Sequence, residues 1–126
     1  MTYKVLIVDD SKLARMAAIK ALSVLQPDWT RVEAADSDEA LRAVQDVHPD
    51  IVLLDFNMPG KNGLDLASEL LSANPHIPVA VISANRQQEI VNRTTAIGAF
   101  FLAKPLTQDG LAEFLRSAVA SLKKTR

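Results

Sequence analysis

The stretch KVLIVDD, residues 4–10, decides the fold class. Four consecutive apolar residues, 5–8, run directly into two adjacent aspartates, Asp9 and Asp10. An unbroken apolar run without polar alternation is typical of a strand buried on both faces, as in a parallel sheet covered by helices. The two carboxylates then stand at the end of a buried strand, where like charges repel and burial makes each charge costlier. We therefore expect a positive partner beside them, and a divalent metal ion is our hypothesis for that partner.

The same pattern recurs along the rest of the chain. Apolar runs at 51–54, 79–82 and 100–103, and a weaker run at 31–35, predict four further strands. Helical spacing predicts helices at 14–25, from Ser37 to Pro49, and at 63–73, 86–97 and 107–122. Ser37 is expected to begin the second helix as its cap. Strand and helix alternate five times, so the sequence predicts an α/β fold: a parallel sheet between two layers of helices.

Composition and charge narrow the possible functions. The chain has 126 residues, of which 48% are hydrophobic, and a formal net charge of -1. This length suits one domain over residues 1–126, and the lack of basic excess argues against nucleic acid as a direct partner. The chain has no cysteine, so disulfides and thiolate metal sites are excluded. No apolar run is long enough for membrane insertion and no signal peptide is recognisable, so we expect a cytoplasmic protein.

Polar side chains follow four of the predicted strands. Asp9 and Asp10 follow the first, Asp55 the third, Ser83 the fourth and Lys104 the fifth. The carboxyl ends of parallel strands meet at one edge of a sheet, so these groups are expected to lie together. One lysine offsets only part of three carboxylates, and Mg²⁺ prefers such hard oxygen ligands while keeping several waters. Such a site can accept a phosphoryl group, with one carboxylate as nucleophile.

Asp55 is the favoured nucleophile. It stands alone before the loop FNMPGKNG, residues 56–63, whereas Asp9 and Asp10 form a pair suited to holding a metal. The glycines and proline of that loop allow a backbone carbonyl to turn inward, and Asn57 is placed to supply it.

Each candidate residue also has a simpler interpretation when taken alone. Asp9 and Asp10 could cap the first helix. Ser83 could be a turn residue and Lys104 a solvated charge, and Phe101 could simply belong to the core. Four strand ends carrying complementary chemistry favour the site over these separate interpretations.

The combination of Asp9-Asp10, Asp55, Ser83 and Lys104-Pro105 resembles the receiver domain of bacterial two-component response regulators, the CheY-like family. The stretches VDDSKLAR (8–15) and DFNMPGKNG (55–63) are most similar to its stand-alone chemotaxis type. The resemblance covers nearly the whole chain. It implies a flavodoxin-like (βα)5 three-layer sandwich whose five parallel strands are ordered 2-1-3-4-5.

The resemblance also implies a role for each site residue. Asp55 would accept a phosphoryl group from a histidine kinase phosphodonor. Asp9, Asp10, Asp55 and the backbone carbonyl of Asn57 would hold Mg²⁺. Lys104 would bind the phosphoryl group, and its bond to Pro105 would be cis. Ser83 and Phe101 would switch the face formed by the fourth helix, fifth strand and fifth helix.

The resemblance implies that the protein would not be an enzyme, although it would catalyse its own phosphoryl transfer from a phosphodonor and its autodephosphorylation. Its partners would be a sensor histidine kinase or a histidine phosphotransfer protein, and a downstream protein target. The output could be docking, phosphoryl relay or a phosphate sink, and the chain could be a domain of a longer regulator. A monomer or weak homodimer is expected.

Four positions differ from relatives or affect what can be transferred from them. Phe101 lacks the hydroxyl of the tyrosine often found there, and Phe56 replaces a tryptophan that some relatives carry. Asn57 and Asn85 occupy positions that tune dephosphorylation, so the phosphoryl lifetime does not transfer from relatives.

Two other functions compete with the receiver hypothesis. A haloacid-dehalogenase-type phosphatase usually starts with D-x-D-x-[TV], whereas this chain has DDSKLA at 9–14 and no cap insertion. A nucleotide-binding domain needs a glycine loop after the first strand, and residues 9–15 contain no glycine.

Overall fold

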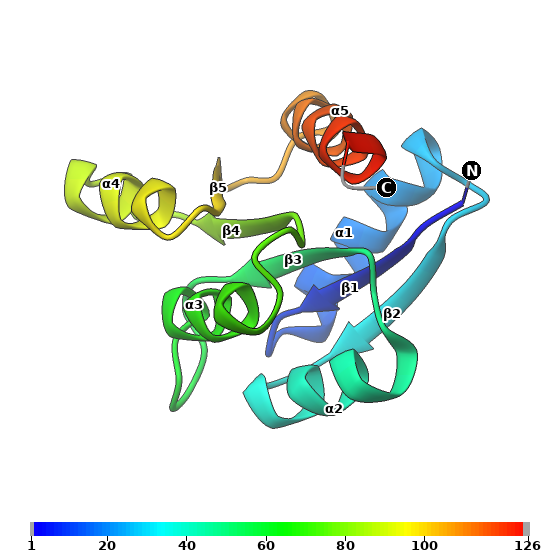
Figure 1. The fold of residues 1–126 in the computed structure, drawn as a ribbon. Coiled ribbons are helices and arrows are strands. Elements are labelled where there is room, and N and C mark those ends of the chain that lie inside the picture. Colours follow the sequence, from blue (N-terminus) through cyan, green and yellow to red (C-terminus); the bar gives the residue numbers. More distant parts are fainter. Residues whose placement is uncertain (1, 125–126) are drawn as a thin grey trace.

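The computed structural model describes residues 2–124, in which strands and helices alternate along the chain (Figure 1). The strands are β1 (Lys4–Val8), β2 (Thr30–Ala34), β3 (Ile51–Asp55), β4 (Val79–Ser83) and β5 (Phe100–Ala103). The helices are α1 (Lys12–Leu25), α2 (Ser37–Val47), α3 (Gly63–Ala73), α4 (Gln88–Ala96) and α5 (Gln108–Lys124). The predicted alternation is therefore confirmed.

The strands form one parallel sheet in the order β2-β1-β3-β4-β5, which confirms the flavodoxin-like topology. β1 lies between β2 and β3, with Ile7 opposite both Glu33 and Leu53. β4 lies between β3 and β5, so Asp55 pairs with Ile82 and Ser83 pairs with Ala103. All five strands point the same way, which brings their carboxyl ends to one edge.

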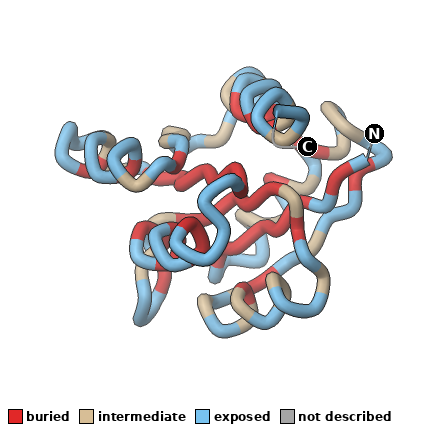
Figure 2. Tube along the Cα trace, in the orientation of Figure 1, coloured by how far each residue is buried: buried red, intermediate tan, exposed pale blue. Residues whose placement is uncertain are grey.

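Alternate residues of the central strands enter two separate cores. Val5 and Ile7 pack with α1 and α5 on one face of the sheet, in a cluster that includes Leu22 and Phe114. Leu6, Val52 and Val81 lie in the cluster on the other face, with residues of α2 and α3. Figure 2 shows the buried strands between more exposed helices. The unbroken apolar runs of β1, β3 and β4 are therefore covered on both faces, as predicted, whereas the run of the edge strand β5 is only partly buried.

Helix ends differ from the sequence prediction by one or two residues. The N-cap of α2 is Asp36, whose side chain accepts a hydrogen bond from the Glu39 N–H, and Ser37 is the first helical residue. The prediction that Ser37 is the cap was wrong because two adjacent residues are both good caps and the backbone turn selects the earlier one. α1 is capped by Ser11, so Asp9 and Asp10 are not its caps.

Trp29 lies at the start of β2, at the opposite end of the strands from Asp9 and Asp55. It is buried and packs edge-on against Tyr3, with ring centroids 5.1 Å apart. Among the described residues, no helix has both the length and the apolar character needed to span a membrane.

Candidate functional site

Backbone hydrogen bonds fix the strand ends that carry the predicted site residues. The N–H of Asp9, just after β1, donates to the carbonyl of Ala34 in β2 over 3.1 Å. The N–H of Phe56, just after β3, donates to Ile82 over 2.9 Å, and the N–H of Lys104 donates to Ser83 over 3.0 Å. The residues immediately after β1, β3 and β5 are thus each tied to a neighbouring strand.

Three carboxylates meet at this edge. One oxygen from each of Asp9, Asp10 and Asp55 lies within 4.8 Å of the others. Asp9 and Asp55 are buried, while Asp10 is exposed. Two unit charges at such a separation repel by roughly 3 kcal/mol at an effective dielectric constant of about 20. The cluster is therefore costly without positive charge.

Lys104 supplies part of that positive charge. Its Nζ lies 2.7 Å from Oδ1 of Asp55, whose side chain is only 4% exposed. The contact is a close ion pair, and among the described residues this oxygen has no hydrogen-bond partner beyond Lys104. A buried carboxylate oxygen that is held by one cation alone still has room to accept a contact from a water or a bound ion.

The pKa values of two groups respond to this crowding. Burial raises the pKa of Asp9; the charges of Asp55 and Asp10 add to the rise, while the Ser11 N–H and Lys104 oppose it. Desolvation alone would lower the pKa of Lys104, but contact with Asp55 and the charges of Asp9 and Asp10 outweigh it and raise that pKa. Lys104 therefore keeps its positive charge at neutral pH.

Ser83 is completely buried at the end of β4. Its Oγ accepts a hydrogen bond from the N–H of Asn85 over 3.0 Å, and its carbonyl accepts the bond from Lys104. The hydroxyl proton remains available to donate, because Oγ acts as an acceptor in this bond. Ser83 therefore connects Lys104, just after β5, to the loop that leads into α4.

Phe101 pairs with Val81 in the sheet but is only half-buried. Neither core cluster of the described residues includes its ring. The interpretation of Phe101 as a core residue is therefore not supported, and its predicted switch role stays a prediction. The neighbouring Phe100 packs edge-on against Phe114 of α5.

The loop after Asp55 contains one position that the sequence analysis did not distinguish. Asn57 is exposed in this loop, and its role as a carbonyl ligand stays a prediction. Gly63, the first residue of α3, lies directly against the end of β3. A Cβ atom there would fall 2.1 Å from the carbonyl oxygen of Asp55. Only glycine fits this contact, which the sequence shows only as one glycine among several turn residues.

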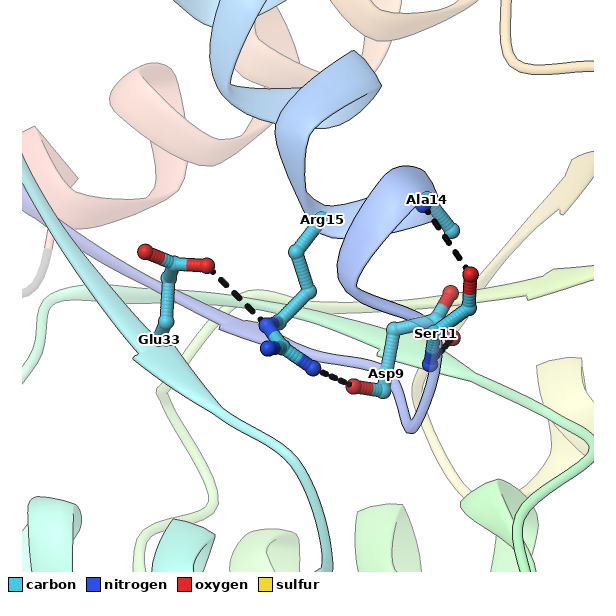
Figure 3. Close-up of polar contacts among 5 residues, drawn as sticks. All are labelled: Asp9, Ser11, Ala14, Arg15 and Glu33. Atoms are coloured by element: carbon cyan, nitrogen blue, oxygen red, sulfur yellow. Dashed lines mark hydrogen bonds and ion pairs between the residues drawn. The ribbon is translucent and has the colours of Figure 1, made fainter.

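A second feature missed by the sequence analysis is the set of contacts around Asp9 (Figure 3). Oδ1 of Asp9 accepts a hydrogen bond from the N–H of Ser11 over 2.9 Å. The guanidinium of Arg15 donates through Nη1 to the carbonyl of Asp9 over 2.6 Å and pairs through Nε with Glu33 over 3.0 Å. Arg15 is part of the VDDSKLAR stretch, but nothing in its spacing indicated this contact.

Two hollows reach the carboxylate cluster. Asp9 and Lys104 line one of about 250 Å³ between α1 and the strand ends. Asp10 and Lys61 line another of about 470 Å³. A further hollow of about 580 Å³, between the end of α1 and α5, is lined by none of the predicted site residues. The cluster is therefore open to small ions and phosphate-sized groups.

The donor set fits a hard divalent cation. Three carboxylates and one ammonium carry a net charge of -2 when all are ionised. The candidate ligands are carboxylate oxygens, and solvent reaches Asp10. Mg²⁺ favours such sites because it binds through one or a few carboxylates and keeps water in its remaining positions.

Comparison with known proteins matches the family model "Response regulator receiver domain" to residues 5–116. The chain belongs to the response regulator receiver family. Among its relatives, the chemotaxis protein CheY of Thermotoga maritima is 34% identical over 116 residues, covering 91% of this chain and 96% of the relative. A receiver domain of a two-component system is a different class of protein from the phosphatase and the nucleotide-binding domain considered above.

Two further comparisons define the extent of the similarity. The crystal structure of the CheX–CheY–BeF3–Mg²⁺ complex from Borrelia burgdorferi aligns with a TM-score of 0.83 at 27% identity, over 93% of this receiver and 89% of that chain. The transcriptional regulatory protein DegU of Brevibacillus brevis is 29% identical over 90% of this receiver, which covers 48% of that relative. The chain thus spans about half the length of several curated relatives that it matches.

Proposed function

We propose that this receiver is phosphorylated on Asp55 in a Mg²⁺-dependent reaction and that the phosphoryl group switches the α4–β5–α5 face to control binding of a partner protein. The observation that carries the proposal is the Asp55 carboxylate, which is buried, paired with Lys104 and close to two further carboxylates. A nucleophile, a cation and an acidic metal-binding pair are the parts that phosphoryl transfer to a carboxylate requires.

In the proposed reaction, an oxygen of Asp55 attacks the phosphorus of a phosphohistidine. The bond between phosphorus and the histidine nitrogen breaks as the bond to Asp55 forms. Bound Mg²⁺, held by Asp9, Asp10 and Asp55 with the Asn57 carbonyl, would neutralise charge on the transferring phosphoryl oxygens. Lys104, already 2.7 Å from Asp55, is placed to bind another of these oxygens without a large movement.

Ser83 and α4 provide a route from the phosphoryl group to the surface. A Ser83 hydroxyl that donates to a phosphoryl oxygen would alter its contact with Asn85, and Asn85 in turn accepts a hydrogen bond from the N–H of Gln87. α4 begins directly afterwards without a side-chain cap and buries only Ile90 and Thr94. A helix held by so few buried residues is easily repositioned.

The partners follow from this chemistry. A sensor histidine kinase or histidine phosphotransfer protein would supply the phosphoryl group, and a downstream protein in the cytoplasm would read the switched face. We propose that the chain is a signalling module rather than an enzyme with a separate substrate, because the acceptor carboxylate belongs to the chain itself.

The test is an NMR comparison of the protein with and without acetyl phosphate, at saturating Mg²⁺. Amide resonances of 84–103 and 108–124 are expected to shift in the wild type. Lys104→Ala should retain Mg²⁺ binding and lose most of these shifts, because the cation that couples the phosphoryl group to β5 is gone. Lys20→Ala removes an exposed lysine of α1 and should respond like the wild type. A full response in Lys104→Ala, or shifts restricted to the loops around Asp9 and Asp55, would contradict the proposal.

A further inference from the structure

Arg15 occupies an unfavourable place for a cation. It lies in the first turn of α1, at the positive end of the helix dipole, and that turn contains no acidic residue. Its side chain is only 14% exposed, although arginine is rarely buried unless it is paired. It also lies close to a carboxylate site that is suited to a divalent cation, and like charges there oppose one another. Some contact must compensate for these costs.

The compensating contacts join three segments of the chain. Nη1 of Arg15 donates to the carbonyl of Asp9 over 2.6 Å, and Nε pairs with Oε1 of Glu33 on β2 over 3.0 Å. Glu33 belongs to the edge strand β2 and lies opposite Ile7 of β1. Ile7 precedes Asp9 by two residues. The guanidinium thus connects β2, α1 and the β1–α1 loop, as Figure 3 shows. Its planar fork allows it to hold two acceptors in fixed directions.

The contact with Arg15 is one of three hydrogen bonds that hold Asp9 in place. The Asp9 N–H donates to Ala34, its carbonyl accepts from Arg15, and Oδ1 accepts from the Ser11 N–H. A carboxylate oxygen of Asp9 lies within 4.8 Å of carboxylate oxygens of Asp10 and Asp55. From this geometry we infer that Arg15 is a positioning residue: it acts on Mg²⁺ binding through the Asp9 carbonyl and does not touch the metal. The inference rests on the proposed metal site and extends it by one residue.

Positioning and simple charge predict opposite results when Arg15 is neutralised. If Arg15 acts only as a nearby positive charge, its removal should strengthen Mg²⁺ binding. If it orients the loop, its removal should weaken binding, typically by about tenfold or more for residues that support metal ligands. The sign of the change therefore decides between the two roles.

The experiment measures Mg²⁺ affinity by isothermal titration calorimetry for wild type, Arg15→Met, Arg15→Lys and Lys12→Met. Arg15→Met should bind about tenfold more weakly. Arg15→Lys keeps the charge but has no fork to hold both acceptors, and it should also bind more weakly than wild type. Lys12→Met removes an exposed charge from the same turn and should not weaken binding. Trp29 fluorescence is unsuitable because Trp29 lies at the far end of the strands.

Amide hydrogen exchange in the metal-free protein gives a second readout. The Ser11 N–H should exchange faster in Arg15→Met, while α3 and α5 retain wild-type protection. Wild-type or tighter Mg²⁺ affinity in Arg15→Met would overturn the inference; should that variant fail to fold, wild-type affinity in Arg15→Lys would do so. Absence of Mg²⁺ binding by the wild type itself would overturn the proposed metal site as well, so the two failures are distinguishable.

Discussion

At the scale of single residues, the site combines groups that are unfavourable in isolation. Asp9 and Asp55 are buried carboxylates of the same charge, and Lys104 forms an ion pair with Asp55. Such an arrangement lowers the stability of the metal-free protein and favours binding of cations. Sites of this kind trade stability for function, and neutral substitutions within them commonly stabilise by about 1 kcal/mol.

Asp9→Asn should therefore stabilise the metal-free protein at pH 7 by about 1 kcal/mol while weakening Mg²⁺ binding. Burial raises the pKa of Asp9 above its ordinary value of 3.8, so the folded state holds its proton more tightly than the unfolded chain. The cost of the charged form is present above the folded pKa and disappears as pH falls toward 3.8. The stability gain of Asp9→Asn should shrink over the same range.

Urea unfolding in the presence of a chelator measures this effect at pH 7 and at successively lower pH. The asparagine can still accept the hydrogen bond from the Ser11 N–H, so the loop contact is retained. Asp10→Asn is the matched control: Asp10 is exposed, and its substitution should give a smaller gain. A loss of stability in Asp9→Asn at pH 7 would show that the carboxylate is well compensated without metal.

At the scale of elements, the junction between β3 and α3 sets the position of Asp55. The N–H of Gly63 donates to the carbonyl of Phe56 over 2.9 Å, which closes the loop that follows Asp55. The missing side chain at Gly63 lets the start of α3 lie directly against the backbone of Asp55. The helix and the acceptor residue are therefore in direct contact.

Gly63→Ala should destabilise the protein by about 2 kcal/mol and slow phosphorylation of Asp55. The added Cβ would lie 2.1 Å from the Asp55 carbonyl oxygen, so the strand end or the helix must move. Gly110→Ala is the control, because its Cβ would lie 3.1 Å from a side-chain atom, the Thr107 Oγ1, and not against backbone. Thermal unfolding and the rate of labelling by acetyl phosphate check both effects. Equal stability and rate in the two variants would contradict this account of Gly63.

The elements also show what local sequence signals can and cannot specify. The unbroken apolar runs predicted β1, β3 and β4 because burial on both faces leaves a direct signature, and they also predicted β5, although that edge strand is only partly buried. The cap of α2 was misplaced because Asp36 and Ser37 are chemically equivalent as caps. Gly63 was not recognised because a close approach between backbones depends on where α3 lies against β3, and spacing along the chain does not encode that.

At the scale of the whole molecule, the fold brings together residues that are far apart in sequence. Asp9, Asp55 and Lys104 meet because β1, β3 and β5 are parallel strands of one sheet. This convergence was predictable from the sequence, since the position of strand ends follows from the alternation of strands and helices. The role of Arg15 was not, because its partner Glu33 is supplied by the edge strand and is identified only by the register of β1 with β2.

The central claim is that Asp55 is a Mg²⁺-dependent phosphoryl acceptor. It is tested most directly by incubating the protein with acetyl phosphate, with and without Mg²⁺, followed by intact mass measurement and peptide mapping. We predict a single phosphoryl adduct on Asp55 that forms only with Mg²⁺ and is absent from Asp55→Asn, whose fold should remain intact. An adduct on another residue, equal labelling of Asp55→Asn, or no adduct despite Mg²⁺ binding would contradict the claim.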